Sequence, residues 1–302
     1  MIEVEGLRKI YHIGFWRKPV HALKGVSFKV GQGELYGFIG PNGAGKSTTI
    51  KILLGLLMPG EGRATLMGLP AGSPESRAEV GFLPEQPYFY DYLSGWEFLA
   101  FYGRLSRLKG PDVGNRIREV VELTGLDDEW LGRKLRTYSK GMLQRIGLAQ
   151  ALLGRPKLVI LDEPMSGLDP MGRRQVRQLL QRLHADGVTV FYSSHVLSDV
   201  EAICTRLAMV VGGEIRRQGT VDEVLAGEEE SYRISLSKDL KADDWPKVPG
   251  EKADGRTVVC RSGESRDALV RWAIAQGLGV EEIRRTRHSL EDVLALEVGK
   301  AQ

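Results

Sequence analysis

The chain has 302 residues, of which 42% are hydrophobic and 27% charged, with a formal net charge of +3. This balance excludes a disordered or fibrous chain and allows one large or two modest globular domains. No apolar run approaches the roughly 20 residues that cross a bilayer, the N-terminus lacks the pattern of a secretion signal, and two cysteines are too few for a disulfide framework. We therefore expect a cytoplasmic protein.

Strands alternate with helices along most of the chain. Alternating or continuous apolar runs predict strands at residues 2–5, 26–30, 34–40, 157–161 and 188–192. Helical patterns run from Lys46 to about Leu57, from about residue 94 to 153, and from residue 173 to 184. A loop rich in aromatic residues is expected between residues 11 and 20. This alternation predicts an α/β fold with a largely parallel central sheet.

The pattern changes near residue 220, which separates a first domain over residues 1–220 from a small α+β domain over 221–302. A charged break at residues 228–230 precedes the second domain. Its predicted strands lie at residues 232–236, 257–260 and 280–285, and its predicted helices at residues 266–276 and from Leu290 onward.

Residues 40–48 read Gly-Pro-Asn-Gly-Ala-Gly-Lys-Ser-Thr and match the pattern G-x-x-x-x-G-K-[ST] between a predicted strand and a predicted helix. Glycines let successive backbone N–H groups point at phosphate oxygens, and the helix N-terminus adds partial positive charge. Lys46 is expected to reach the β- and γ-phosphates and the Ser47 hydroxyl to bind Mg²⁺. The other phosphate contacts are expected from Asn42, Gly43, Ala44, Gly45 and Thr48.

Two acids end the predicted strand that begins near residue 157. Such positions lie where open α/β sheets bind ligands. We expect Asp162 to hold the Mg²⁺ shell and Glu163 to polarise the attacking water as a general base. Two acids that merely cap the next helix are the alternative, which the phosphate motif makes less favoured.

Further motifs occur in a fixed order. Gln86 lies in Phe-Leu-Pro-Glu-Gln-Pro, residues 138–142 read Tyr-Ser-Lys-Gly-Met at the start of a predicted helix, residues 166–169 read Ser-Gly-Leu-Asp, and His195 follows a strand. Together with the phosphate motif, this series over residues 1–220 resembles the ATPase subunits of ATP-binding cassette (ABC) transporters.

The resemblance implies a P-loop NTPase fold of the ABC type, with a helical subdomain at about residues 87–155, that uses ATP and Mg²⁺. Gln86 is then expected to contact Mg²⁺ or the attacking water, and His195 to donate a hydrogen bond to the γ-phosphate from a strand beside that of Asp162. Ser139 and Gly141 are expected to bind the γ-phosphate of ATP held by a second copy, with Asp169 beside it. Taken alone, Ser139 reads as a helix N-cap. Tyr138, Lys140 and Met142 depart from the commonest form of the family signature.

Two aromatic segments leave alternatives open. Tyr11 resembles the residue that stacks on adenine in the family, but His12, Phe15 and Trp16 belong to the same expected loop. Residues 88–90, Tyr-Phe-Tyr, predict either an apolar plug of their own domain or a surface that receives a helix of a membrane subunit.

One phosphate motif and one signature helix per chain imply a homodimer, because in the family these two elements close on one ATP only between subunits. The resemblance also implies separate multi-span permease subunits, docked near residues 86–90, that hold the protein on the inner face of the membrane. The region after residue 220, with Ser-Leu-Glu-Asp-Val at residues 289–293 near its end, resembles the C-terminal extension of drug- and antibiotic-export ATPases, so we expect an exporter. A soluble family member that clamps ribosomes or DNA, or a non-hydrolysing regulator, is the alternative. The chain lacks the second cassette or coiled coil of the former, so no nucleic acid is expected, while Glu163 and His195 argue against the latter.

Overall fold

The computed structural model describes residues 1–14, 18–226, 231–240, 245–260, 262–286 and 289–300. It divides into two compact units: the first comprises Met1–Val221 and Lys300–Gln302, and the second comprises Asp222–Gly299. Within the described residues, no helix combines the length and apolarity that a membrane crossing requires.

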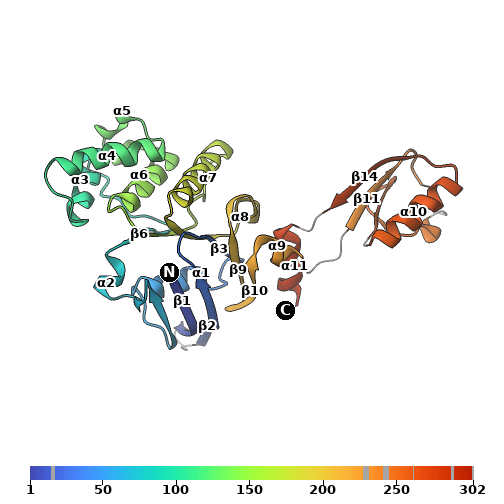
Figure 1. Ribbon diagram of the computed structural model, residues 1–302, viewed down its shortest axis with the longest axis horizontal. Helices are drawn as coiled ribbons and strands as arrows, with labels where there is room; N and C mark the ends of the chain where they lie inside the picture. Colours follow the sequence, from blue (N-terminus) through green and yellow to red (C-terminus); the bar gives the residue numbers. More distant parts are fainter. Residues whose placement is uncertain (15–17, 227–230, 241–244, 261, 287–288, 301–302) are drawn as a thin grey trace. The chain divides into compact units, whose positions relative to one another are not determined.

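The centre of the first unit is a six-stranded sheet with the order β10-β9-β3-β8-β7-β6 (Figure 1). Its strands are β3 (Leu35–Ile39), β6 (Val80–Leu83), β7 (Leu158–Asp162), β8 (Thr189–Ser194), β9 (Arg206–Val211) and β10 (Glu214–Thr220). All neighbours pair in parallel except β9 and β10. Every residue of β3, β7 and β8 is buried, because helices and a second sheet together cover the two faces, and this explains their continuous apolar sequences. The expected α/β fold with a parallel core is confirmed.

A second, antiparallel sheet with the order β2-β1-β4-β5 packs against this core. It consists of β1 (Ile2–Ile13), β2 (Lys18–Val30), β4 (Glu61–Leu66) and β5 (Leu69–Pro70). Phe28 joins the two sheets, with its ring centroid 5.1 Å from that of Phe38 and 5.7 Å from that of Phe191. The expectation of two short strands around a loop was wrong in extent, since Tyr11 pairs with Val20 within the β1–β2 hairpin. Register shifts along β1 interrupt the alternation from which strand length is read.

Helices surround the central sheet and form a separate layer beyond β6. Next to the central sheet lie α1 (Lys46–Leu53), α7 (Pro170–Ala185) and α8 (Leu197–Ile203), whereas α2 (Pro74–Arg77) contacts β4 and β5 of the antiparallel sheet. The helical layer contains α3 (Gly95–Leu105), α4 (Pro111–Thr124), α5 (Asp128–Leu131), a 3-10 turn (Leu135–Thr137) and α6 (Lys140–Leu152). Ser94 and Glu97 form a capping box at the start of α3. Helix α1 ends four residues before the predicted Leu57, because Gly55 adopts a left-handed conformation against Gly72.

The second unit is a four-stranded antiparallel sheet with the order β12-β13-β11-β14. Its strands are β11 (Ser231–Leu236), β12 (Glu251–Lys252), β13 (Thr257–Cys260) and β14 (Val280–Thr286). Its helices are α9 (Val221–Leu225), a 3-10 turn (Trp245–Lys247), α10 (Gly263–Ala275) and α11 (Leu290–Gly299). Alternate residues of β11 and β13 form a small core with Leu269 and Ala273 of α10. The charged break predicted at residues 228–230 lies outside the described residues.

Candidate nucleotide site

The phosphate motif forms a tight turn between the end of β3 and the start of α1. Gly45 adopts a left-handed conformation with φ of 107° at the helix N-cap, where a Cβ would lie 2.7 Å from the carbonyl oxygen of Ala22. At Gly40, a Cβ would lie 2.1 Å from the carbonyl oxygen of Val210. Glycine is therefore required at both positions. The turn encloses a pocket of about 260 Å³ lined by Ala22, Asn42, Gly43, Ala44, Gly45, Lys46, Ser47, Thr48, Glu85 and Glu163.

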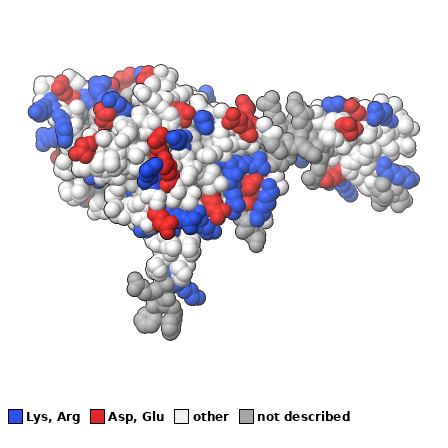
Figure 2. Space-filling view, turned by 60° about the horizontal axis from the view of Figure 1, so that its bottom comes forward, with Lys and Arg blue, Asp and Glu red and all other residues white. Residues whose placement is uncertain are grey.

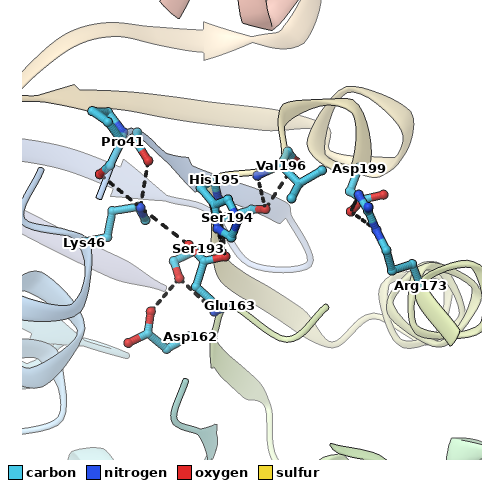
Figure 3. A network of polar contacts seen from close by, with 11 residues as sticks. Pro41, Lys46, Asp162, Glu163, Arg173, Ser193, Ser194, His195, Val196 and Asp199 are labelled. Carbon is cyan, nitrogen blue, oxygen red and sulfur yellow. Dashed lines mark hydrogen bonds and ion pairs between the residues drawn. The ribbon is translucent and has the colours of Figure 1, made fainter. Parts of the chain in front are cut away.

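Lys46 lies buried in this pocket and is held by oxygen atoms on two sides (Figure 3). Its Nζ donates to the carbonyl oxygens of Gly40, at 2.7 Å, and Pro41, at 3.3 Å. The same Nζ lies 3.5 Å from Oε1 of Glu163. A buried ammonium group requires such partners, and they direct its charge into the pocket beside the α1 N-terminus.

The two acids follow each other at the carboxyl end of β7, and both are buried. Glu163 has φ of 52°, a left-handed conformation that costs a residue with a side chain about 1–3 kcal/mol. Its backbone N–H donates to the Ser193 hydroxyl oxygen at 3.0 Å, and that hydroxyl donates to Oδ1 of Asp162 at 2.6 Å. Ser193 of β8 therefore holds the carboxylate of Asp162 and the backbone of Glu163, and it stabilises the strained backbone at Glu163.

His195 follows β8 directly and reaches the carboxylate of Glu163. Its backbone N–H donates to Oε2 at 3.3 Å, and its ring Nδ1 lies 2.8 Å from the same oxygen. Because β7 and β8 are adjacent parallel strands, their carboxyl ends meet at one edge of the sheet. The predicted neighbourhood of these two strands is confirmed.

The signature residues line a different pocket. This pocket, of about 490 Å³, is lined by Gly125, Leu126, Asp127, Trp130, Ser139, Lys140, Gly141, Met142, Arg145, Gly167, Leu168, Asp169 and Gly172. Ser139 caps α6, with its Oγ accepting from the N–H of Met142 at 3.3 Å, and Asp169 caps α7 through Gly172 at 2.7 Å. Since the serine oxygen accepts in the cap, its proton stays available for a ligand. The phosphate-turn pocket and the signature pocket have no lining residue in common.

The side chain of Tyr138, next to Ser139 in the signature, is buried in the helical layer and does not line the signature pocket. Its hydroxyl donates to the carbonyl oxygen of Trp130 at 2.6 Å, and burial raises the pKa of Tyr138 to about 12. The residue that replaces the commonest leucine therefore anchors the start of α6 to the end of α5.

Two further predicted site residues, Tyr11 and Gln86, differ in their relation to the phosphate turn. The Tyr11 hydroxyl lies 3.5 Å from Oγ1 of Thr48, which places this aromatic ring beside the turn. His12 is exposed on the same strand, while Phe15 and Trp16 lie outside the described residues. Gln86 is exposed, and the pocket wall includes its neighbour Glu85 instead.

The aromatic residues after Gln86 differ in their exposure. Phe89 packs on Phe98 of α3, with ring centroids 5.4 Å apart, so it belongs to the helical layer. Tyr88 is 84% exposed.

Ser193 and Glu85 were not among the predicted site residues. For Ser193 a signal was present, because it lies two positions before His195 and strand alternation places both on the same side. No sequence signal indicated Glu85, because it is adjacent to Gln86 in a loop whose sequence has no periodicity that predicts which of the two side chains faces the pocket.

The comparison with known proteins identifies the family. Over 303 residues the chain is 36% identical to the ABC transporter ATP-binding protein YxlF of Bacillus subtilis, and the match covers 97% of this chain and 98% of that protein. The chain belongs to the ABC transporter ATP-binding proteins. The family model for ABC transporters matches residues 23–166. This ABC subunit binds and hydrolyses ATP, and its P-loop fold is that of the family.

Other relatives and solved structures also belong to the ABC transporter ATP-binding proteins. The subunit is 48% identical over 238 residues to an ABC transporter ATP-binding protein of Synechocystis, covering 78% of this chain and 67% of that one. It is 36% identical over 222 residues to the linearmycin resistance ATP-binding protein LnrL of Bacillus subtilis, covering 73% and 69%. The dimeric bacterial ABC cassette MJ0796 superposes with a TM-score of 0.68 at 25% identity, covering 73% of this chain and 99% of that one.

Proposed function

We propose that two copies of this ABC subunit close head to tail on ATP and thereby drive separate membrane subunits that export a substrate. The observation that carries the proposal is the separation of the phosphate-turn pocket from the signature pocket within one chain. Each pocket offers donors for phosphate, yet neither contains both sets. A second copy supplies the missing half of each site, and a two-fold axis then completes two sites at once.

In each site, the phosphate turn of one copy binds the nucleotide. Lys46 and the N–H groups of residues 42–48 face the phosphates, while Tyr11 beside Thr48 stacks on adenine. From the other copy, Ser139 and Gly141 bind the γ-phosphate, and Asp169 positions the loop beside them. Because the γ-phosphate joins the copies, its loss on hydrolysis loosens the dimer, and this two-state change moves the membrane partner.

The residues around Asp162 fit Mg²⁺. Ser47, Asp162 and Gln86 offer only oxygen ligands, which this cation prefers. The described residues contain no group of three or more His, Cys, Asp or Glu side chains able to hold a metal unaided, so nucleotide oxygens and water would complete the shell. Bound there, Mg²⁺ would neutralise charge on the phosphates.

Glu163 acts as the general base for the attacking water. Its carboxylate lies between Lys46, at 3.5 Å, and His195, at 2.8 Å, at the pocket wall. For Lys46 to bind the γ-phosphate, its contact with Glu163 gives way, which frees Oε1 to accept a proton from water. Nδ1–H of His195 orients the base through Oε2, and with the second ring nitrogen also protonated, Nε2–H donates a hydrogen bond to the γ-phosphate.

Export is the proposed direction, and one relative supports it, because the name of LnrL associates that protein with resistance to linearmycin. The permease docks beside Gln86 and the exposed Tyr88, which places the ABC subunit on the inner face of the membrane. Basic and acidic side chains lie side by side on the face in Figure 2, whereas surfaces that bind nucleic acid concentrate basic residues. The charge on this face therefore gives no support to nucleic acid as the partner.

Complementation between two defective variants tests the head-to-tail dimer. Lys46→Ala removes a phosphate contact but keeps the signature, and Ser139→Arg blocks the signature pocket but keeps the turn. Each variant alone is expected to lose ATP turnover. Mixed in equal amounts, they form dimers with one intact site, so turnover returns at a substantial fraction of the wild-type rate.

Full turnover by Ser139→Arg alone, or no recovery on mixing, would contradict the proposal. Two Lys46→Ala preparations, mixed at the same total concentration, are the matched control. Capture of a multi-span protein from membranes by Glu163→Gln with ATP tests the permease assignment, and capture of nucleic acid instead would contradict it.

A further inference from the structure

The sheet of the second unit exposes one long edge strand. Within the described residues, β14 pairs only with β11, so its outer backbone groups face away from the sheet. The opposite edge, β12, has only two residues. An edge of seven residues is a template for another strand unless its side chains prevent pairing.

The charges of β14 are antisymmetric about its central residue. Its sequence reads Val-Glu-Glu-Ile-Arg-Arg-Thr from residue 280 to 286, with Ile283 in the middle. An antiparallel copy centred on Ile283 places Glu282 opposite Arg284 of the second copy, and Arg284 opposite Glu282. The same register places positions 281 and 285, a glutamate and an arginine in the sequence, opposite each other. Opposite charges at directly facing positions stabilise an antiparallel pair.

We propose that β14 is a self-complementary interface that pairs with β14 of a second copy of this chain, in the antiparallel register centred on Ile283. The contact lies on a different unit from the ATP-binding dimer proposed above. It continues the sheet across a two-fold axis and gives an isologous interface, in which each charged pair occurs twice.

The charge pattern distinguishes this pairing from simple protection of the edge. Edges guarded against association carry charges of one sign or inward-pointing charges, which repel every strand. In β14 the two signs repel a parallel copy in register, where glutamates would face glutamates, but attract an antiparallel one. The pattern therefore selects one partner and one direction.

Side-chain exposure fits this arrangement. The side chains of Glu282 and Arg284 are 53% and 71% exposed. They form an ion pair with each other at 2.9 Å, which shows that both lie on the same face of the strand, and both can therefore contact a neighbouring strand on that face. Across β11, Arg284 faces the like-charged Arg233. A glutamate of the second copy on the other side of Arg284 offsets that repulsion.

Ile283 supplies the apolar centre of the pair. It lies opposite Ile234, which is fully buried, but is itself 47% exposed at the margin of the core. Facing Ile283 of a second copy would cover this surface.

A single strand pair buries less than the roughly 1,200 Å² of a stable interface. The contact is therefore weak in the isolated unit and gains strength when another interface holds two copies together. The strength of the β14 contact, but not its register, depends on the proposed ATP-bound dimer, which raises the effective concentration of one β14 near the other.

Disulfide cross-linking of the full-length chain with ATP tests the register. In an antiparallel pair, facing Cβ atoms lie about 4.5–5.5 Å apart, close to the separation in a disulfide. Ile283→Cys faces itself and is expected to cross-link under mild oxidation at least about tenfold faster than two controls. The first control is Glu281→Cys, because in this register position 281 of one copy lies four residues, about 14 Å along the strand, from position 281 of the other copy. The second control is Ile274→Cys, because Ile274 is 67% exposed on α10 of the same unit and lies outside the proposed interface.

Charge exchange tests the complementarity in the Ile283→Cys background. Glu282→Arg replaces two attractions by two repulsions and is expected to slow cross-linking about tenfold. Adding Arg284→Glu inverts the pattern, restores opposite charges across the axis, and should restore the rate. The wild-type chain, whose two cysteines are Cys204 and Cys260, gives the background.

Cross-linking of Ile283→Cys no faster than Ile274→Cys, or a rate unchanged by Glu282→Arg, would overturn the inference. If complementation of Lys46→Ala by Ser139→Arg succeeds under the same conditions, only the β14 interface is then wrong. If complementation fails while Ile283→Cys cross-links in register, the ATP-bound dimer is wrong and the β14 interface stands.

Discussion

The Nδ1 atom of His195 lies 2.8 Å from Oε2 of Glu163, and the backbone N–H of His195 donates to the same oxygen. Two groups of one residue therefore fix the carboxylate proposed to activate water. Two positions earlier on the same side of β8, Ser193 fixes the backbone of Glu163. The end of β8 thus orients the proposed base at both its side chain and its main chain.

His195→Ala is expected to lower ATP turnover about 10²- to 10⁴-fold, because the proposed base loses its orienting partner and the γ-phosphate loses its proposed donor. ATP binding should change little, since the phosphate turn remains intact. Steady-state turnover and equilibrium nucleotide binding measure the two effects. His21→Ala, at an exposed position of β2, is the control, and equal losses in both variants would contradict the role of His195.

Ser193→Ala is expected to lower turnover about 10- to 100-fold, because the backbone of Glu163 loses its partner and the base moves. The substitution also leaves a buried N–H unpaired, at a cost of about 1–3 kcal/mol in the free energy of unfolding.

Thr189→Ala provides the matched control for that loss of stability. Thr189 is a fully buried hydroxyl on the same strand, and it accepts from the N–H of Gly33 at 2.8 Å. It should lose similar stability in denaturant unfolding but retain turnover. If both variants lose turnover in proportion to their stability, Ser193 has only a structural role.

Gly40→Ala is expected to abolish ATP binding and to destabilise the first unit by more than about 2 kcal/mol, because the new methyl group would collide with the carbonyl oxygen of Val210. Gly187→Ala is the control: it has φ of 81° with open space around the added Cβ, so it pays only about 1 kcal/mol of backbone strain. Thermal unfolding and nucleotide titration distinguish them. Normal ATP binding by Gly40→Ala would show that the turn tolerates displacement from β9.

Tyr11→Ala is expected to raise the KM for ATP about tenfold with little change in kcat, because the proposed stacking on adenine would contribute to binding and not to the chemical step. Tyr11→Phe should bind normally, since the 3.5 Å contact of the hydroxyl with Thr48 is long. His12→Ala tests the neighbouring candidate. A KM effect in that variant instead would reassign the adenine contact.

Much of the fold was predictable because its signals are local. The buried strands β3, β7 and β8 are continuous apolar runs, and the glycine-rich turn joins a strand to a helix within nine residues. The β1–β2 hairpin was less predictable, because its bulges break the alternation of apolar residues that defines a strand.

The sequence alone determined which chemical groups belong to the candidate site. These are a lysine and hydroxyls in a phosphate turn, two acids at the end of a strand, and a histidine that follows another strand. Residue type and spacing suffice for these because each motif lies within one short segment. Only the tertiary structure showed that Ser193 bridges Asp162 and Glu163 and that β14 lies at an edge of its sheet. It also showed that Glu85, rather than the adjacent Gln86, lines the phosphate-turn pocket. Those relationships join segments that are distant in the chain, and packing of the strands, rather than sequence spacing, determines which atoms meet.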